Sequence, residues 1–175
     1  TNGSVEDAAY QTYLDKIGAY TFNAMGCLST NETIQDLFVS FCKRMRDDVG
    51  KKFQVVLYNA LADYEGIVSV KNTVQEENEA TVGEAQADHA VVSSEDRETA
   101  LVPWVTGIIA GTAVNKSATN ALYDGEYPVD TDYTQSELED GILEGSFMLH
   151  LVDDDVVVLE DINTFVSVTD EKSSD

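Results

Sequence analysis

The 175-residue chain is 43% hydrophobic, so it can bury a core as one domain, or as one domain with an appended piece. Its 33 acidic and 10 basic residues give a formal net charge of −23 and a pI near 4.1. That negative charge repels phosphate backbones and anionic membranes, which disfavours nucleic-acid binding and favours an acidic, well-solvated surface.

The N-terminus, the apolar runs and the cysteines indicate the cellular compartment expected for the chain. Residues 1–10 lack a basic region followed by an apolar one, so no signal peptide is expected there. No apolar run approaches the ~20 residues of a membrane-spanning helix, so no membrane insertion is expected. Because the chain opens on Thr1 rather than Met, we consider it an excised piece of something longer. Cys27 and Cys42 are too far apart for a C-x-x-C motif and are expected to be reduced core residues in a cytosolic product.

The first half of the chain predicts a βαβ unit. A short helix is expected over residues 7–18, followed by a β-rich run over 20–28. A long amphipathic helix over 31–49 then leads into mostly apolar strands at 53–58 and 66–70. This order favours a parallel sheet covered by helices.

The 31–49 segment carries the strongest periodic signal. Ser29 followed by Glu32 fits a capping box, and Gly50 fits a C-terminal stop. Lysine and arginine in the last turns suit the helix dipole. The apolar positions at helical spacing are Ile34, Leu37, Phe38, Phe41, Cys42, Met45 and Val49.

The second half is more varied. Residues 100–114 predict a short apolar helix with Pro103 near its start. The Gly107-x-x-x-Gly111 spacing there indicates close packing of this helix on the sheet, with Trp104 in the core. The other expected features are an irregular connection over 72–96 with a short strand at 90–92, a loop over 123–133, a helix over 135–143, a hairpin of 147–152 and 156–159, and a further strand over 162–168.

These elements predict an α/β fold with a mainly parallel sheet flanked by helices and a C-terminal β-hairpin region. We divide the chain into an α/β domain over residues 1–122 and a loop, helix and hairpin region over residues 123–175.

The sequence offers little for catalysis. His89 lies in the polar connection and His150 in a predicted strand, so neither has a recognisable catalytic context. No G-x-S-x-G elbow, G-x-G-x-x-G fingerprint or P-loop occurs. No catalytic residue and no cofactor are therefore predicted, although an α/β enzyme with an unrecognised site stays an alternative.

Two clusters of carboxylates are candidates for a metal site. Asp130-x-Asp132 begins like a calcium loop, but Gln135 and Gly141 stand where an EF-hand needs Gly and Glu. Three adjacent carboxylates, 153–155, could hold a cation at a hairpin tip, although such a turn is more often simply solvated. No metal ligand is predicted, and an acidic, calcium-dependent binding module remains a second alternative.

The charges are separated along the chain. Residues 124–161 contain thirteen acids, and residues 117–171 contain no Lys or Arg. Opposite charges separated in this way can steer copies of a chain together head to tail, and the competing explanation is a dipole-matched helix end plus general acidity. The residues of the possible subunit interface are Lys43, Arg44, Arg46, Lys51 and Lys52.

Several stretches, in a shared order, resemble the sheath protein of contractile phage tails, especially the type found in defective prophages and tailocins. The glycine-containing opening at residues 1–3 with Tyr10 resembles the entry into the family's central domain. The strand-to-helix passage over 20–34 and the strand over 51–57 are also similar to the family. Its most specific stretches are LVPWVTGIIAGTAVNKS at 101–117 and EDINTF at 160–165.

The resemblance implies a subtilisin-like α/β domain without protease activity, and it supplies no catalytic residues. It implies a virion-tail subunit, made in the bacterial host cytoplasm, that polymerises with other sheath subunits around a tail tube protein and contracts to drive the tube through a cell envelope. Family chains are longer and carry terminal arms that link subunits into a mesh. The 175-residue piece is therefore expected to be monomeric alone.

Overall fold

The computed structural model describes residues 7–75, 96–113 and 115–167. The main sheet has the strand order β1-β2-β3-β4 and is parallel throughout. These strands are β1 (Ala24–Gly26), β2 (Gln54–Tyr58), β3 (Ile67–Val70) and β4 (Ser146–Phe147). Strands β2 and β3 are buried along nearly their whole length, which explains why both read as apolar runs without alternation.

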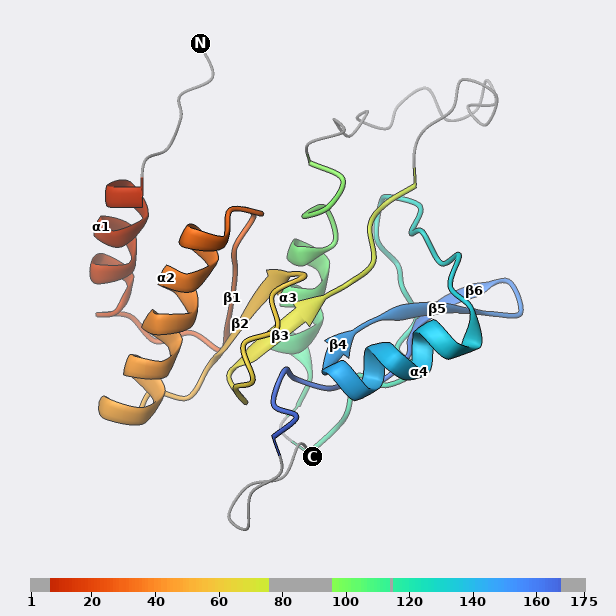
Figure 1. Cartoon of the computed structure of the whole chain (residues 1–175). Coiled ribbons are helices and arrows are strands. Elements are labelled where there is room, and N and C mark those ends of the chain that lie inside the picture. Colours follow the sequence, from red (N-terminus) through yellow and green to blue (C-terminus); the bar gives the residue numbers. More distant parts are fainter. Residues whose placement is uncertain (1–6, 76–95, 114, 168–175) are drawn as a thin grey trace.

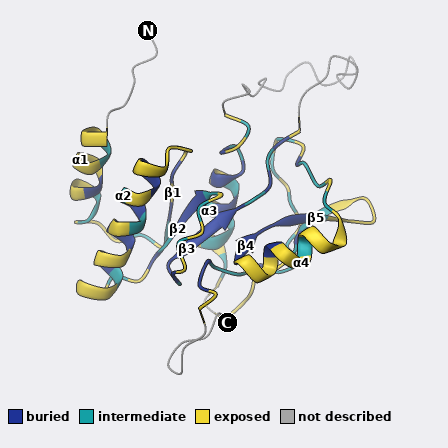
Figure 2. Ribbon diagram, viewed as in Figure 1, coloured by how far each residue is buried: buried dark blue, intermediate teal, exposed yellow. Residues whose placement is uncertain are grey.

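Helices cover both faces of this sheet (Figure 1). On one face lie α1 (Asp7–Ile17) and α2 (Glu32–Lys43), and α2 continues into the π-helical turn η1 (Arg44–Asp48). On the other lies α3 (Val102–Gly111), packed against β1 and β2. Helix α4 (Gln135–Glu144) lies next to β4, with a largely exposed outer surface (Figure 2).

The core is divided by the sheet into two clusters. Alternate residues of β2 point to opposite faces, as the pleat requires. Val55 and Leu57 pack with the aromatic residues of α2, such as Phe38 and Phe41. Val56 packs on the other face with the buried residues of α3 and of the C-terminal region. The predicted α/β class with a parallel sheet flanked by helices is confirmed.

The hairpin is also confirmed, although Phe147, predicted to open its first strand, belongs to β4 of the main sheet. Strands β5 (Leu149–Val152) and β6 (Asp155–Val158) pair antiparallel, with Leu149 opposite Val158. Asp153 takes a left-handed conformation at φ 54°, as tight hairpin turns require. Strand β4, from the region that we separate at residue 122, pairs with β3, and the boundary itself stays a prediction.

Two local predictions were wrong, and one predicted strand is shorter than expected. The N-cap of α2 is Asn31, whose side chain accepts bonds from the Thr33 and Ile34 backbone amides, so Ser29 and Glu32 form no capping box. The β-rich run over 20–28 contributes a strand of three residues. Residues 162–167 form no strand, and Thr164 instead donates its backbone amide to the Ile67 carbonyl.

The glycines of α3 do not pack on the sheet. A Cβ added at Gly107 or Gly111 would meet no atom within 4 Å. The close approach is made by Gly26 of β1, where a Cβ would lie 2.7 Å from Thr106 Oγ1. Trp104 is half-buried against the second core cluster, and its Nε1 donates to Asp124 Oδ1 at 2.8 Å. The glycine pair was therefore assigned to the wrong side of the helix, and Trp104 is a partly buried residue at the edge of the core.

The predicted stop at Gly50 is confirmed by its φ of 82°, and the predicted strand at 90–92 lies outside the described residues. In the described part of the chain, no helix combines the length and apolar character needed to cross a membrane.

Candidate assembly surface

The five predicted interface residues lie on the last turn of α2, on η1 and on the loop that leads into β2. In η1 the backbone widens, and the Val49 amide reaches back five residues to the Arg44 carbonyl at 3.3 Å. The widened turn places Met45 in the core. It also places the side chain of the next residue, Arg46, against the strands instead of in solvent.

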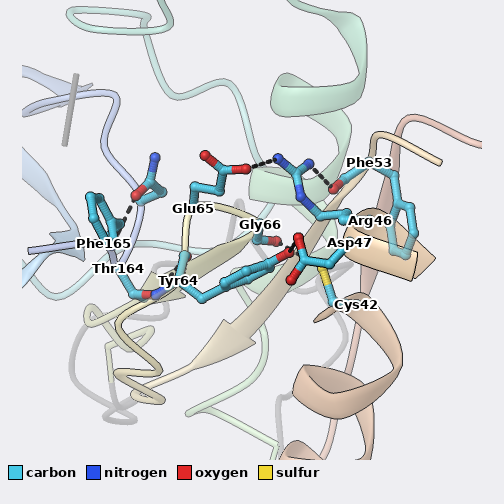
Figure 3. Close-up of polar contacts among 10 residues, drawn as sticks. Cys42, Arg46, Asp47, Phe53, Tyr64, Glu65, Gly66, Thr164 and Phe165 are labelled. Carbon is cyan, nitrogen blue, oxygen red and sulfur yellow. Dashed lines mark hydrogen bonds and ion pairs between the residues drawn. The ribbon is translucent and has the colours of Figure 1, made fainter. Parts of the chain in front are cut away.

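Arg46 is an internal link (Figure 3). Its Nη1 donates to the Phe53 carbonyl at 2.7 Å, and its Nη2 donates to Glu65 Oε1 at 3.0 Å. The side chain is 12% exposed. The guanidinium joins the end of α2 to the segments entering β2 and β3, so Arg46 is committed within the chain.

Lys51 is also committed within the chain. Its Nζ donates to the carbonyl oxygens of Gly18 and Tyr20, at 2.5 Å and 3.2 Å. These bonds fasten the loop after α1 to the loop before β2. Sequence patterning did not reveal this role, because the partners are backbone carbonyls that lie far away in the sequence.

Lys43, Arg44 and Lys52 remain at the surface. The Lys43 ammonium lies 5.4 Å from the centre of the Tyr64 ring. Arg44 lies 3.9 Å from Asp15 with both side chains more than half exposed, a geometry that contributes little stability. Lys52 makes no ion pair with any described residue. The structure therefore divides the predicted basic cluster into three surface cations and two internal ones.

Lys52 borders a hollow with a volume of about 430 Å³. Arg46 and Lys116 also line it, and Ile109 and Ala110 of α3 form an apolar wall. Sequence reasoning missed Lys116, because it belongs to the loop after α3 and comes close to Lys52 through the fold alone.

One acidic residue, Asp161, lines the same hollow. Its Oδ2 accepts a bond from the Ala118 amide at 2.8 Å, and its own amide donates to Thr119 Oγ1 at 2.9 Å. These bonds hold the loop after α3 against the segment at 160–165. The two sequence stretches that resemble the sheath family most specifically therefore meet at the rim of this hollow.

Acidic side chains dominate a different part of the surface. The outer side of α4 and the β5–β6 turn are exposed (Figure 2). In the turn, Asp153, Asp154 and Asp155 all face solvent, next to the exposed apolar residues Leu151 and Val152.

The metal-site candidates do not assemble a site. Asp130 Oδ1 accepts the Asp132 backbone amide at 3.1 Å, forming a local turn. Across residues 7–75, 96–113 and 115–167, no group of three His, Cys, Asp or Glu is arranged to hold a metal ion.

Only one of the two histidines considered as catalytic bases lies within the described residues. His150 lies on β5 opposite Val157, and its Nε2 has no hydrogen-bond partner among the described residues. His89 is outside those residues. Burial raises the pKa of the Cys42 thiol to about 12, so it stays protonated and donates to the Gly66 carbonyl at 3.4 Å. Both cysteines are free and buried, as predicted.

The fold and surface define an α/β domain with a parallel core and segregated surface charge. The protein-family model described as the phage tail sheath protein central domain matches residues 3–164 of the chain. The chain belongs to this family. Two proteins of Bacillus subtilis (strain 168) are similar over 99% of the chain: the uncharacterized protein YqbK, at 30% identity, and the phage-like element PBSX protein XkdK, at 28%. The chain spans 35% of the length of each.

Solved structures agree with the fold. Sheath tail proteins from Desulfitobacterium hafniense and Listeria innocua match 98% of the chain with a TM-score of 0.81, at 36% and 30% identity. The chain covers 38% and 37% of them. The helical sheath of the anti-feeding prophage in its contracted state matches 91% of this chain, with a TM-score of 0.58. The match covers 44% of the length of the prophage sheath chain. At 12% identity, it supports the fold alone.

Proposed function

We propose that the chain is the central part of a structural subunit of a contractile tail sheath. The observation that carries this proposal is the match of the sheath central-domain family to residues 3–164. In the proposed function, copies of the subunit polymerise around a tail tube protein in the virion tail after synthesis in the bacterial host cytoplasm. Contraction of the sheath drives the tube through a cell envelope.

The architecture suits a unit that moves as a rigid body. The sheet is packed on both faces, and the end of α2 is fixed to two strands by Arg46. Closely packed interiors transmit strain and do not deform continuously, so contraction would exchange contacts between copies. The proposal includes no enzymatic activity, no cofactor, no nucleic-acid partner and no membrane insertion.

Electron microscopy of the polypeptide that carries this chain tests the assembly. Tubes or rings are expected, and antibodies against the exposed surface of α4 should label intact tails along their length. A persistently monodisperse monomer under all assembly conditions, or labelling confined to one end of the tail, would contradict the proposal. The 175-residue piece on its own is expected to sediment as a monomer at low concentration.

Two assays test the alternatives. A broad hydrolase screen is expected to give no turnover above buffer. Calcium at the ionic strength of a sodium chloride control is expected to give the same melting temperature as the control. A calcium-specific rise would instead support the acidic binding module, with the turn at 153–155 as the first place to examine.

A further inference from the structure

The hollow beside Lys52 gathers unusually many cations for so acidic a chain. Three of the ten basic residues, Arg46, Lys52 and Lys116, line it. The Arg46 head group is held by Glu65 and the Phe53 carbonyl. Lys52 and Lys116 are exposed and make no ion pair with a described residue. Asp161 also lines the hollow, with its carboxylate accepting the Ala118 amide, so three cations and one carboxylate leave the lining with a net positive charge.

The hollow also has an apolar side. Ile109 and Ala110 on the last turns of α3 line it, and Ala110 is exposed. A ligand that fills the hollow would then be anionic where it meets the two lysines and apolar where it meets α3.

The β5–β6 turn has this combination of properties. Its tip carries Asp153 and Asp154, Asp155 follows as the first residue of β6, and all three are exposed. Leu151 and Val152, which lead into the tip, are 54% and 43% exposed, although they belong to a strand with a hydrophobic sequence. An antiparallel hairpin is a stiff, narrow projection, so docking it costs less entropy than ordering a flexible loop.

A chain cannot place this turn in its own hollow. In Figure 1 the turn between β5 and β6 lies at one side of the molecule, away from α3 and β2. The hollow is lined by residues at the end of α3 and at the start of β2. Because each copy carries both surfaces at different places, one copy can dock on the next without any other partner. Such a heterologous contact propagates into rings or helical filaments.

We propose that the Lys52–Lys116 hollow receives the β5–β6 turn of a second copy, with the turn carboxylates facing the two lysines. Val152 then lies toward α3, and Leu151, the preceding residue of β5, points to the opposite face of the hairpin. The inference rests on the proposed sheath function, because the contact forms in the assembled state. Of the five interface residues predicted from sequence, the contact keeps Lys52. Arg46 and Lys51 are committed within the chain, Lys43 and Arg44 do not line the hollow, and Lys116 is added.

Cross-linking between two variants of the full assembling polypeptide tests the contact. One carries Ala113→Cys, which lines the hollow, and the other carries Val152→Cys beside the turn. All five turn and hollow charges are kept. Cys27 and Cys42 are buried, so neither competes. Oxidation of the assembled mixture should give a disulfide-linked dimer, whereas Val152→Cys mixed with Ala8→Cys on exposed α1 should give at least about tenfold less.

Charge reversal provides the second arm. Lys52→Glu with Lys116→Glu should lower the cross-link yield about tenfold, whereas Lys16→Glu on α1 should leave it unchanged. Adding Asp153→Lys and Asp154→Lys to the partner variant should restore much of the yield.

The outcomes separate this inference from the proposed function. Tubes or rings that form without the Ala113–Val152 cross-link would overturn the docking inference and leave the sheath function standing. A hollow occupied by an acidic segment of another protein would leave the Ala113–Val152 pair without a cross-link in assemblies that still form, and would also overturn it. Absence of any assembly would contradict the sheath function and the docking inference together.

Discussion

Asn72 is a buried amide that joins three parts of the chain. It is fully buried, and its Nδ2 donates to the carbonyls of Asp130 and Leu149, both at 2.9 Å. Its Oδ1 accepts the Leu149 amide at 2.8 Å. The side chain therefore fixes the start of the hairpin and the loop at 130 against the end of β3, and it satisfies backbone groups that water does not reach.

We expect Asn72→Ala to lower the free energy of unfolding by about 2–4 kcal/mol, because it strands buried backbone donors and acceptors. Urea denaturation followed by circular dichroism measures this loss. The exposed Asn115→Ala should change stability by less than about 0.5 kcal/mol. Equal effects of the two substitutions would show that the Asn72 bonds carry no net stability.

Asp63 fastens the segment that follows the hairpin. Its carboxylate accepts the backbone amides of Val166 and Ser167 and the Ser167 hydroxyl, and these bonds hold the pKa of Asp63 below its usual value. Because the pKa is lowered in the folded state, the ionised Asp63 carboxylate stabilises this segment fully above the unfolded-state pKa, near 3.9. This stabilisation is lost as the pH falls through the lower folded-state pKa.

Asp63→Asn removes this charge but keeps a residue that accepts the observed φ of 46°. We expect amide exchange at Val166 and Ser167, corrected for intrinsic pH dependence, to be several-fold faster in the variant at neutral pH. In the parent protein the same acceleration should appear below about pH 4. Exchange that is equally slow in both proteins at neutral pH would contradict the role of the carboxylate.

At the level of elements, the sequence predicted what depends on local patterning. The periodic apolar stripe gave α2, and the unbroken apolar runs gave β2 and β3. The turn of aspartates between two short runs gave the hairpin. Each of these signals arises within one element, where the helical or pleated period determines which side chains are buried.

The predictions that failed depend on contacts between elements. The close-packing glycine is Gly26 on the strand, and the Gly107–Gly111 spacing within α3 could not reveal which face of the helix meets β1. Arg46 appeared to be a surface cation, because the 3.6-residue period does not anticipate the π-turn that directs it inward. Likewise, Lys116 joins the hollow through tertiary structure alone.

Arg46 connects the end of α2 to the segments that enter β2 and β3. Its replacement should therefore lower the stability of the packing of α2 on the sheet. Arg46→Ala leaves the Phe53 carbonyl and the Glu65 carboxylate without this donor. We expect a loss of about 2 kcal/mol, or about 4–8 °C in melting temperature for a chain of this size. Arg46→Lys should recover part of the loss, because one ammonium cannot reproduce the forked contact.

The surface variant Arg44→Ala is the matched control, since its pair with Asp15 is exposed. Differential scanning calorimetry should show a change of less than about 2 °C for it. A similar effect in both arginine variants would mean that the inward position of Arg46 contributes nothing beyond general helix-end charge.

For the whole molecule, the net charge of −23 opposes folding, because the acidic groups repel one another in the compact state. Among the described residues three salt bridges are present, two of them with a partner side chain at least half exposed, so local pairing offsets little of the repulsion. Raising sodium chloride from about 10 mM to about 100 mM shortens the Debye length from about 30 Å to about 10 Å. Repulsion between acidic groups spread over α4, the hairpin and the loops is then screened.

We therefore expect the melting temperature to rise by about 2–4 °C over this range, which corresponds to a gain of about 1 kcal/mol. Differential scanning fluorimetry measures it, and sorbitol at matched osmolality controls for general solute effects. A fall in melting temperature with salt would show that the attractive pairs outweigh the repulsion.

In the assembled sheath, we expect added salt to lower the stability of the assembly instead of raising it. Salt there also screens the attraction between the hollow at Lys52 and Lys116 and the acidic turn of the next copy.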